Sequence, residues 1–109
     1  MSKIVKGTTP SILLDFDEFP LDVHDIVKIS MIIQHGQKEW DVTDDIAFNR
    51  EELQAVYHFS QSQTLALSQN HEIYFEADVL MNNGEVYRVA EGTYGIKPTM
   101  RKGVLTYGL

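Results

Sequence analysis

The chain has 109 residues, with 9 Lys and Arg against 16 Asp and Glu, a formal net charge of −7, four His and no Cys. This length fits one domain around one core, and the lack of Cys excludes disulfides, thiolate zinc or iron–sulfur sites and a Cys nucleophile. The acidic balance argues against nucleic acid and anionic membranes as partners, because both would repel a negatively charged protein.

Composition favours strands over helices. Val, Ile, Thr and the aromatic residues make up 36 of the 109 residues, whereas Ala and Leu number only 5 and 9. β-Branched and aromatic side chains fit a pleated, half-buried surface and lose rotamer freedom in helices. With turn signals every 8–12 residues, we expect an all-β fold, a single antiparallel β-sandwich of immunoglobulin-like type, with six to seven strands in residues 1–109.

The first half of the chain predicts three strands. Residues 1–10 lack the long apolar run of a signal peptide and are expected to form an extended arm. Ile12, Leu14 and Phe16 then alternate as one face of a strand, and an acidic loop follows to residue 25. In residues 26–34 the predicted core face consists of four alternate apolar residues, Val27, Ile29, Met31 and Ile33.

A turn around Gly36 predicts a hairpin, in which residues 38–42 return as the next strand. Trp40, the single tryptophan, is expected to fill the core, because large aromatic residues are mostly buried.

Residues 49–58 allow two interpretations. Asn49-Arg50-Glu51-Glu52 resembles a capping box and suggests a helix through Tyr57. We favour a strand, because four alternate residues are apolar: Leu53, Ala55, Tyr57 and Phe59. A second capping pattern at residues 60–63 predicts one short helical turn near residues 61–67.

The clearest pattern lies in residues 71–81, where apolar and polar residues alternate. Its core face is predicted to consist of Ile73, Phe75, Ala77, Val79 and Met81. Asn83-Gly84 can take the two positive φ angles of a type I′ turn, so a hairpin should follow. Its second strand is predicted to run from Glu85 to about Gly95 and to pair back on the first.

No catalytic, cofactor or metal site emerges from the sequence. His24, His35, His58 and His71 lie on four separate elements without metal-ligand spacing, so we interpret them as unrelated surface or boundary residues. The acidic clusters at residues 15–18 and 41–45 are expected to cap turns, with calcium binding left open. There is also no nucleophile elbow or glycine-rich phosphate loop, so we expect that the protein is not an enzyme.

Tyrosines are the remaining candidate binding residues. Aromatic side chains supply a large contact area at low entropic cost, so exposed ones can anchor a protein or stack on a sugar. Three tyrosines lie on or near the last hairpin and a fourth lies near the end of the chain. The predicted partner-binding residues are therefore Tyr74, Tyr87, Tyr94 and Tyr107.

Four short phrases occur in an order that is similar to a known group of proteins. They are Val5-Lys6-Gly7-Thr8-Thr9-Pro10, Gln34-His35-Gly36, Phe59-Ser60-Gln61-Ser62-Gln63-Thr64-Leu65 and Lys102-Gly103-Val104-Leu105. With them the chain resembles small, roughly hundred-residue β-rich proteins of phages and prophages of Gram-positive bacteria. That group is itself similar to the N-terminal domain of phage upper-baseplate proteins.

The resemblance implies a non-enzymatic tail- or baseplate-associated component, made in the bacterial cytoplasm and then associated with the virion. Its partners would be other phage structural proteins or further copies of itself. It also implies a last strand at Val104-Leu105. Residues 104–109 are expected to form an extended arm, and Thr106-Tyr107-Gly108-Leu109 departs from the group by extending past its usual end, which suggests an attachment arm. Two alternatives remain: a module that binds host cell-wall glycans, and a small phage-encoded regulator that binds a host protein.

Overall fold

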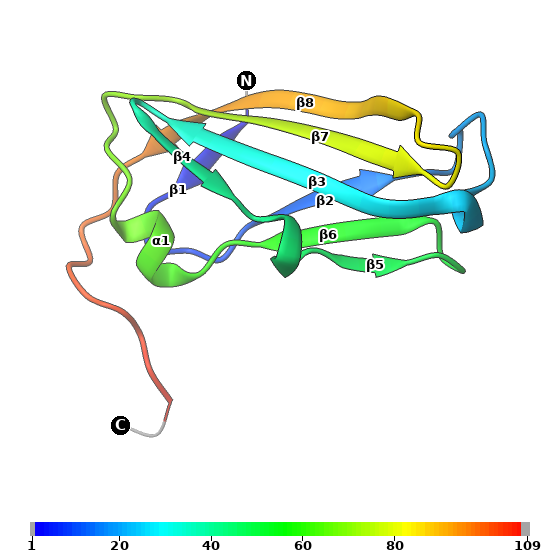
Figure 1. Cartoon of the computed structure of the whole chain (residues 1–109). Helices are drawn as coiled ribbons and strands as arrows, with labels where there is room; N and C mark the ends of the chain where they lie inside the picture. Colours follow the sequence, from blue (N-terminus) through cyan, green and yellow to red (C-terminus); the bar gives the residue numbers. More distant parts are fainter. Residues whose placement is uncertain (1, 108–109) are drawn as a thin grey trace.

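The computed structural model describes residues 2–107, which form two facing β-sheets (Figure 1). The described part holds eight strands: β1 (Lys3–Val5), β2 (Ser11–Asp15), β3 (Ile26–His35), β4 (Lys38–Asp41), β5 (Ala47–Asn49), β6 (Gln54–His58), β7 (Ile73–Met81) and β8 (Val86–Lys97). One sheet has the order β1-β8-β7-β3-β4 and the other the order β2-β6-β5. The predicted all-β sandwich is confirmed, with eight strands in the described part instead of the expected six to seven; the short strands β1 and β5 were not predicted.

Hairpins build most of the larger sheet. β3 pairs antiparallel with both β4 and β7, and β7 pairs antiparallel with β8. β1 is the exception, since it lies parallel to the end of β8 and faces only Gly95 to Lys97. Three short helical elements connect the strands: η1 (Val23–Asp25), η2 (Thr43–Asp45) and α1 (Gln61–Leu65).

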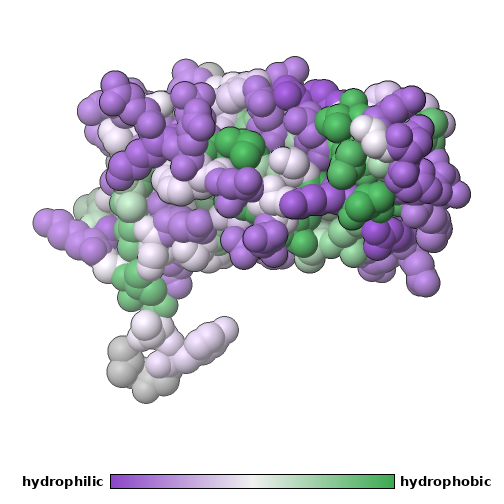
Figure 2. Space-filling model, in the orientation of Figure 1, coloured by the Kyte–Doolittle hydropathy of each residue, from purple (hydrophilic) through white to green (hydrophobic). Residues whose placement is uncertain are grey.

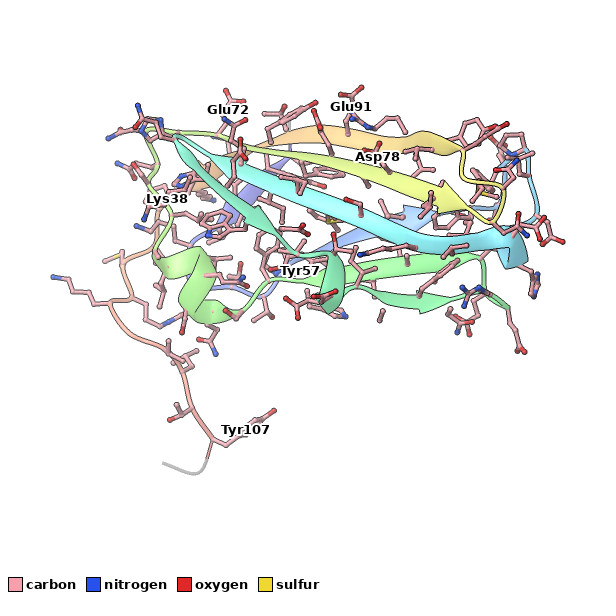
Figure 3. All side chains as sticks on the ribbon, in the orientation of Figure 1. Lys38, Tyr57, Glu72, Asp78, Glu91 and Tyr107 are labelled. Carbon is pink, nitrogen blue, oxygen red and sulfur yellow. The ribbon has the colours of Figure 1, made fainter. Side chains whose placement is uncertain are left out.

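The core lies between the two sheets, and β7 contributes to it as the alternation predicts. Every second residue of β7 from Ile73 to Met81 is buried, and the residues between them are half-buried on the opposite face. The smaller sheet supplies Ile12, Leu14, Ala55 and Tyr57 from its facing side. Figure 3 shows Tyr57 between the sheets. Burial of this apolar surface is the main term that stabilises the fold.

Val27 does not belong to the predicted core face. The pairing of β3 with β7 is irregular between Ile26 and Lys28, so one extra residue enters the strand there. Ile26 is therefore buried, whereas the Val27 side chain is 59% exposed. A single inserted residue reverses the face of those before it, which a strict two-residue period cannot represent.

Trp40 does not fill the core either. It lies on β4, an edge strand whose four residues are all exposed, and its side chain is 37% exposed. Its ring stacks beside His35 at a centroid distance of 6.3 Å, and it borders a small cavity with Tyr57 and Leu67. Trp40 therefore covers the rim of the core at the edge of the sheet.

The β7–β8 turn differs from the predicted type I′ turn. Met81 N donates to Glu85 O at 2.8 Å and Gly84 N donates to Met81 O at 2.9 Å, so three residues form the loop. Gly84 has a φ of +87°, whereas Asn83 does not have a positive φ. This is the geometry of a three-residue loop that ends in a left-handed glycine.

Residues 54–58 form a strand, as favoured from the alternation, and the helix alternative is wrong. The oxygen Oδ1 of Asn49 does accept a hydrogen bond from Glu52 N at 3.1 Å, as in a capping box. However, Leu53 takes a φ of +57°, and the chain reverses into β6 beside β5. The capping pattern thus closes a hairpin instead of starting a helix.

The short helix α1 forms as predicted and holds the N-terminal segment. Ser60 and Gln63 make the reciprocal capping box. Thr64, which is fully buried, accepts a hydrogen bond from Gly7 N at 2.9 Å and donates one to Thr8 O at 2.7 Å. One hydroxyl therefore ties α1 to the turn between β1 and β2.

Neither end of the chain matches its predicted role completely. The N-terminal segment contains β1, which joins the larger sheet instead of projecting as an arm. Val104 and Leu105 form no strand, because the tail leaves the sandwich beyond α1 (Figure 1). The Gln61 side chain binds the backbone of Leu105, with Nε2 donating to Leu105 O at 3.0 Å and Oε1 accepting from Leu105 N at 2.9 Å. Residues 108 and 109 of the predicted arm lie outside the described residues.

Replacement of Thr64 by Val should destabilise the protein by about 1–3 kcal/mol, because the buried Gly7 N–H loses its acceptor. Thr64→Ser keeps the hydroxyl and should cost less. Urea unfolding followed by tryptophan fluorescence measures both. Equal midpoints for the Val and Ser variants would contradict the assigned role of the hydroxyl.

Candidate functional site

One side of β8 is unpaired along most of its length. β7 covers one edge of the strand, but β1 reaches only Gly95 to Lys97 on the other. Within residues 2–107, no strand pairs with this second edge between Val86 and Thr93. We call these eight residues the β8 free edge.

The outward backbone groups of the β8 free edge follow from its neighbours. The bond from Gly95 N to Ser2 O, 3.1 Å long, shows that Gly95 points away from β7. Backbone groups alternate along a strand, so the N–H and C=O groups of Thr93 and Glu91 also point away from β7. At the other end Met81 N bonds to Glu85 O, so the backbone groups of Tyr87 bond to β7. The backbone groups of Val86 and Arg88 therefore point away from β7, and we call such residues outward residues.

A β-bulge at Val89 separates these two pairs of outward residues. Asp78 of β7 faces Arg88 and Ala77 faces Ala90, so Val89 is the extra residue. Val89 and Ala90 both pack against the core. Consequently Arg88 and Glu91 both lie on the outer face of the sheet, although a regular strand would place them on opposite faces.

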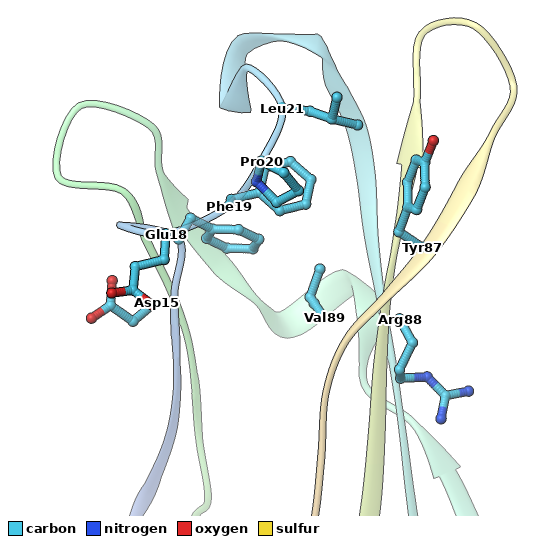
Figure 4. A pocket seen from close by; sticks show the side chains of 9 residues that line it. Asp15, Glu18, Phe19, Pro20, Leu21, Tyr87, Arg88 and Val89 are labelled. Carbon is cyan, nitrogen blue, oxygen red and sulfur yellow. The ribbon is translucent and has the colours of Figure 1, made fainter.

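An apolar groove adjoins the β8 free edge on its inner side. Phe19, Pro20 and Leu21 of the loop after β2 face Tyr87 and Val89, as Figure 4 shows. The groove has a volume of about 320 Å³ and also touches Asp15, Glu18 and Arg88 at its margin. We call it the β8 groove. Phe16, which is buried, also lines the groove and meets the Phe19 ring edge-on at a centroid distance of 5.6 Å.

A charged cluster covers the outer face beside the same edge. Arg88 Nε lies 2.5 Å from Asp78 Oδ1, and its Nη2 lies 3.1 Å from Glu76 Oε2. Its Nη1 lies 3.6 Å from Glu91 Oε2. Tyr74 donates to Glu91 at 2.7 Å and also lies 3.0 Å from a Glu76 oxygen. One guanidinium thus serves three carboxylates, so the cluster keeps an excess of negative charge.

The carboxylates change how their neighbours ionise. The hydrogen bond to Glu91 is the main cause that raises the pKa of Tyr74 to about 12, since the phenol is needed as a donor. The Asp78 hydrogen bond likewise raises the pKa of Arg88 above its usual value. Both groups therefore keep their protons through the neutral range, and none of this geometry prepares a general acid or base.

The structure does not bring the four predicted tyrosines together. Tyr74 belongs to the outer cluster, whereas Tyr87 borders the β8 groove (Figure 4). Tyr94 faces inward and stacks on Phe75 at 5.9 Å. Tyr107 is fully exposed on the tail, far from Glu91 and Asp78 in Figure 3. Their shared role in partner binding stays a prediction.

The histidines are not all unrelated surface residues. His35 is buried, and its ring meets that of His71 edge-on at 5.8 Å. Its Nε2 lies 3.2 Å from Ser68 N, which ties β3 to the loop before β7. The other two, His24 and His58, are exposed, as expected. Among the described residues, no three His, Asp or Glu side chains converge on a metal-sized site.

The acidic clusters do cap turns. Asp15 Oδ1 accepts from Asp17 N at 2.9 Å, and Asp41 Oδ1 accepts from Thr43 N at 3.0 Å. Hydrogen bonds from Thr43 hold the pKa of Asp41 below its usual value. These carboxylates are thus engaged by their own backbone, as is common for Asp in loops.

Sequence reasoning missed the residues that shape the β8 groove. Phe19-Pro20-Leu21 is an apolar run inside an acidic loop, and that contrast was the available signal. The bulge at Val89 left no such signal. Figure 2 shows hydrophobic residues exposed toward the right-hand end of the molecule. Val27 near the start of β3 and Val86 at the start of β8 both have exposed side chains.

Two comparisons with known proteins found no match to this chain. No protein-family model matches the sequence, and a search of the curated proteins found no match. In the part of the chain that the structure describes, no helix is both long and apolar enough to span a membrane. The similarity to phage proteins therefore stays a prediction.

Removal of the Glu91 carboxylate should return the pKa of Tyr74 toward 10. A raised pKa in the folded state means that the stability contributed by this phenol is complete below about pH 10. It is lost as the pH rises toward about 12. Glu91→Gln should therefore shift one tyrosine to lower pH in an ultraviolet titration.

Glu85→Gln is the matched comparison. Its hydrogen bond raises the pKa of Tyr87, so this variant should move the titration of Tyr87 to lower pH and leave that of Tyr74 unchanged. Tyr74→Phe removes the titration step of Tyr74 and so identifies it among those of the other tyrosines. An unchanged titration of Tyr74 in the Glu91 variant would contradict the assigned cause.

Proposed function

We propose that this protein is a non-enzymatic assembly component that acts through protein–protein contacts. The observation that carries the proposal is the β8 free edge together with the β8 groove beside it. An unpaired strand edge offers backbone donors and acceptors in a fixed row, and an adjacent apolar groove offers specificity for side chains. These are the two requirements for recognition of an extended segment of another chain.

The chemistry of the surface supports binding more than catalysis. Tyr74, Glu76, Arg88 and Glu91 satisfy one another by hydrogen bonds and ion pairs. A general acid or base needs a pKa near the working pH, whereas the shifts of Tyr74 and Arg88 go away from neutrality. The cluster therefore suits a fixed, polar margin of a contact surface.

Association with phage particles is the biological setting that we propose, on the strength of the four motifs. Of these motifs, the Gly7-Thr8 turn and the helix that begins after Ser60 meet at Thr64. These two phrases therefore have a structural role in this chain, which agrees with a family that shares a fold without shared catalytic residues.

Glycan recognition receives less support from the geometry. Sugar binding by a sandwich commonly uses two or three exposed aromatic rings on one surface, because rings stack on the apolar faces of sugars. Trp40, Tyr87 and Tyr107 are exposed but belong to β4, β8 and the tail. These three aromatic residues come from separate parts of the described chain.

The setting is tested on phage particles from a strain that carries the gene. We expect mass spectrometry of density-gradient-purified particles to find the protein in a constant ratio to a tail protein, because a structural component is incorporated in fixed number. An abundant cytosolic host protein is the control for contamination. Expression of the protein in the infected cell without its presence in the particles would contradict the phage assignment.

A further inference from the structure

We propose that the β8 free edge binds the same edge of a second copy of this chain, antiparallel and around a two-fold axis. The inference rests on the proposed function and names the partner of that site. It follows from three features of residues 86–93: the backbone groups that point outward, the side chains that would face each other, and the charges on the outer face.

The backbone groups match in one register. The outward residues are Val86 and Arg88 before the bulge and Glu91 and Thr93 after it. When Arg88 faces Glu91 of the second copy, Val86 also faces Thr93 of that copy. All four outward residues then meet outward residues, so each pair can exchange N–H to O=C bonds as in an antiparallel ladder. Other registers match only some of them.

The bulge is what makes this edge self-complementary. It places two residues whose backbone groups face β7, Val89 and Ala90, at the centre of the β8 free edge. One pair of outward residues lies on each side of them. The two-fold axis passes between these residues, and Val89 faces Ala90 of the second copy. The pairing ends at Gly95, where β1 occupies the edge. The usable length is therefore the same eight residues in both copies.

Side chains complement each other in the same register. Tyr87 faces Gly92 of the second copy on the inner side, where an aromatic ring can cover a glycine that has no side chain of its own. Gly92 cannot carry one, since a Cβ there would lie 2.8 Å from the Phe75 ring. Val86, which is 62% exposed, gains the β-branched Thr93 as its neighbour.

Charge also fits on the outer face. Arg88 of each copy lies opposite Glu91 of the other, which gives two ion pairs across the axis. Within one chain Arg88 Nη1 is 3.6 Å from Glu91, the loosest of its three carboxylate contacts. The net charge of −7 on each copy opposes association, so a weak dimer is expected. Measurements belong at about 0.15 M salt, where the screening length is about 8 Å.

Sedimentation equilibrium of the full chain from about 10 μM to about 1 mM tests the dimer. Thr93→Pro should abolish it, because proline removes an outward N–H and places its ring in the path of the second strand. The proline removes no bond to β7. Glu39→Pro is the matched control, since Glu39 points outward from β4, the opposite edge of the same sheet. That variant should still form dimers.

A charge exchange keeps the test independent of proline. Arg88→Glu and Glu91→Arg should each be monomeric alone, because each brings like charges face to face. An equimolar mixture should form a heterodimer, in which two glutamates of one copy face two arginines of the other. Circular dichroism establishes that each variant is folded before mixing. Amide exchange should slow at Arg88, Glu91 and Thr93 as the concentration of the unmodified chain rises.

Three results would overturn the inference. The first is a strict monomer at the highest concentration. The second is a dimer that Thr93→Pro leaves intact. The third is a dimer lost on Leu105→Ser or Tyr107→Ser instead, which would assign the contact to the exposed tail. If the protein is monomeric but present in purified particles, only the dimer fails; if it dimerises but is absent from them, only the phage assignment fails.

Discussion

One additional residue in β8, Val89, determines which side chains lie on each face of the larger sheet along the β8 free edge. Val89 and Ala90 both pack inward, and the pairing with β7 moves by one position. Arg88 can therefore join Glu76, Asp78 and Glu91 on the outer face, while Tyr87 and Val89 line the groove inside. Without the bulge, the residues on one side of it would exchange faces, and cluster and groove could not both exist.

The parallel strand β1 sets the other limit of the site. It is only three residues long, and it covers β8 from Gly95 onward. Its position depends on the turn at Gly7, whose N–H is bound by the buried hydroxyl of Thr64. A short covering strand leaves the remainder of β8 open, and natural sandwiches usually protect such an edge with charges or bulges. Here the bulge and Arg88 lie within the open edge itself.

Local pattern was sufficient for the elements with regular geometry. β7 alternates without interruption, and α1 begins at a capping box in which both reciprocal bonds form. Pattern failed where the chain departs from regular geometry. Val27 is the extra residue of a bulge, and the segment from Asn49 to Glu52 closes a hairpin turn with a helix-like capping bond. The prediction that Trp40 fills the core failed for a different reason. The hydrophobicity of a residue does not tell whether its strand lies at the centre or the edge of a sheet.

The sequence by itself determined the all-β class, the hairpins around Gly36 and Gly84, and the lack of any thiolate chemistry. Residue type and a two-residue period suffice for these, since both act between near neighbours. Only the tertiary structure decided that β1 joins β8, that β8 contains a bulge, and that the 15–21 loop faces Tyr87. Those contacts join residues that are distant in the chain, and they depend on how two sheets share one core. The candidate site is made of such contacts. For this reason only two of the four tyrosines chosen from the sequence, Tyr74 and Tyr87, lie at it.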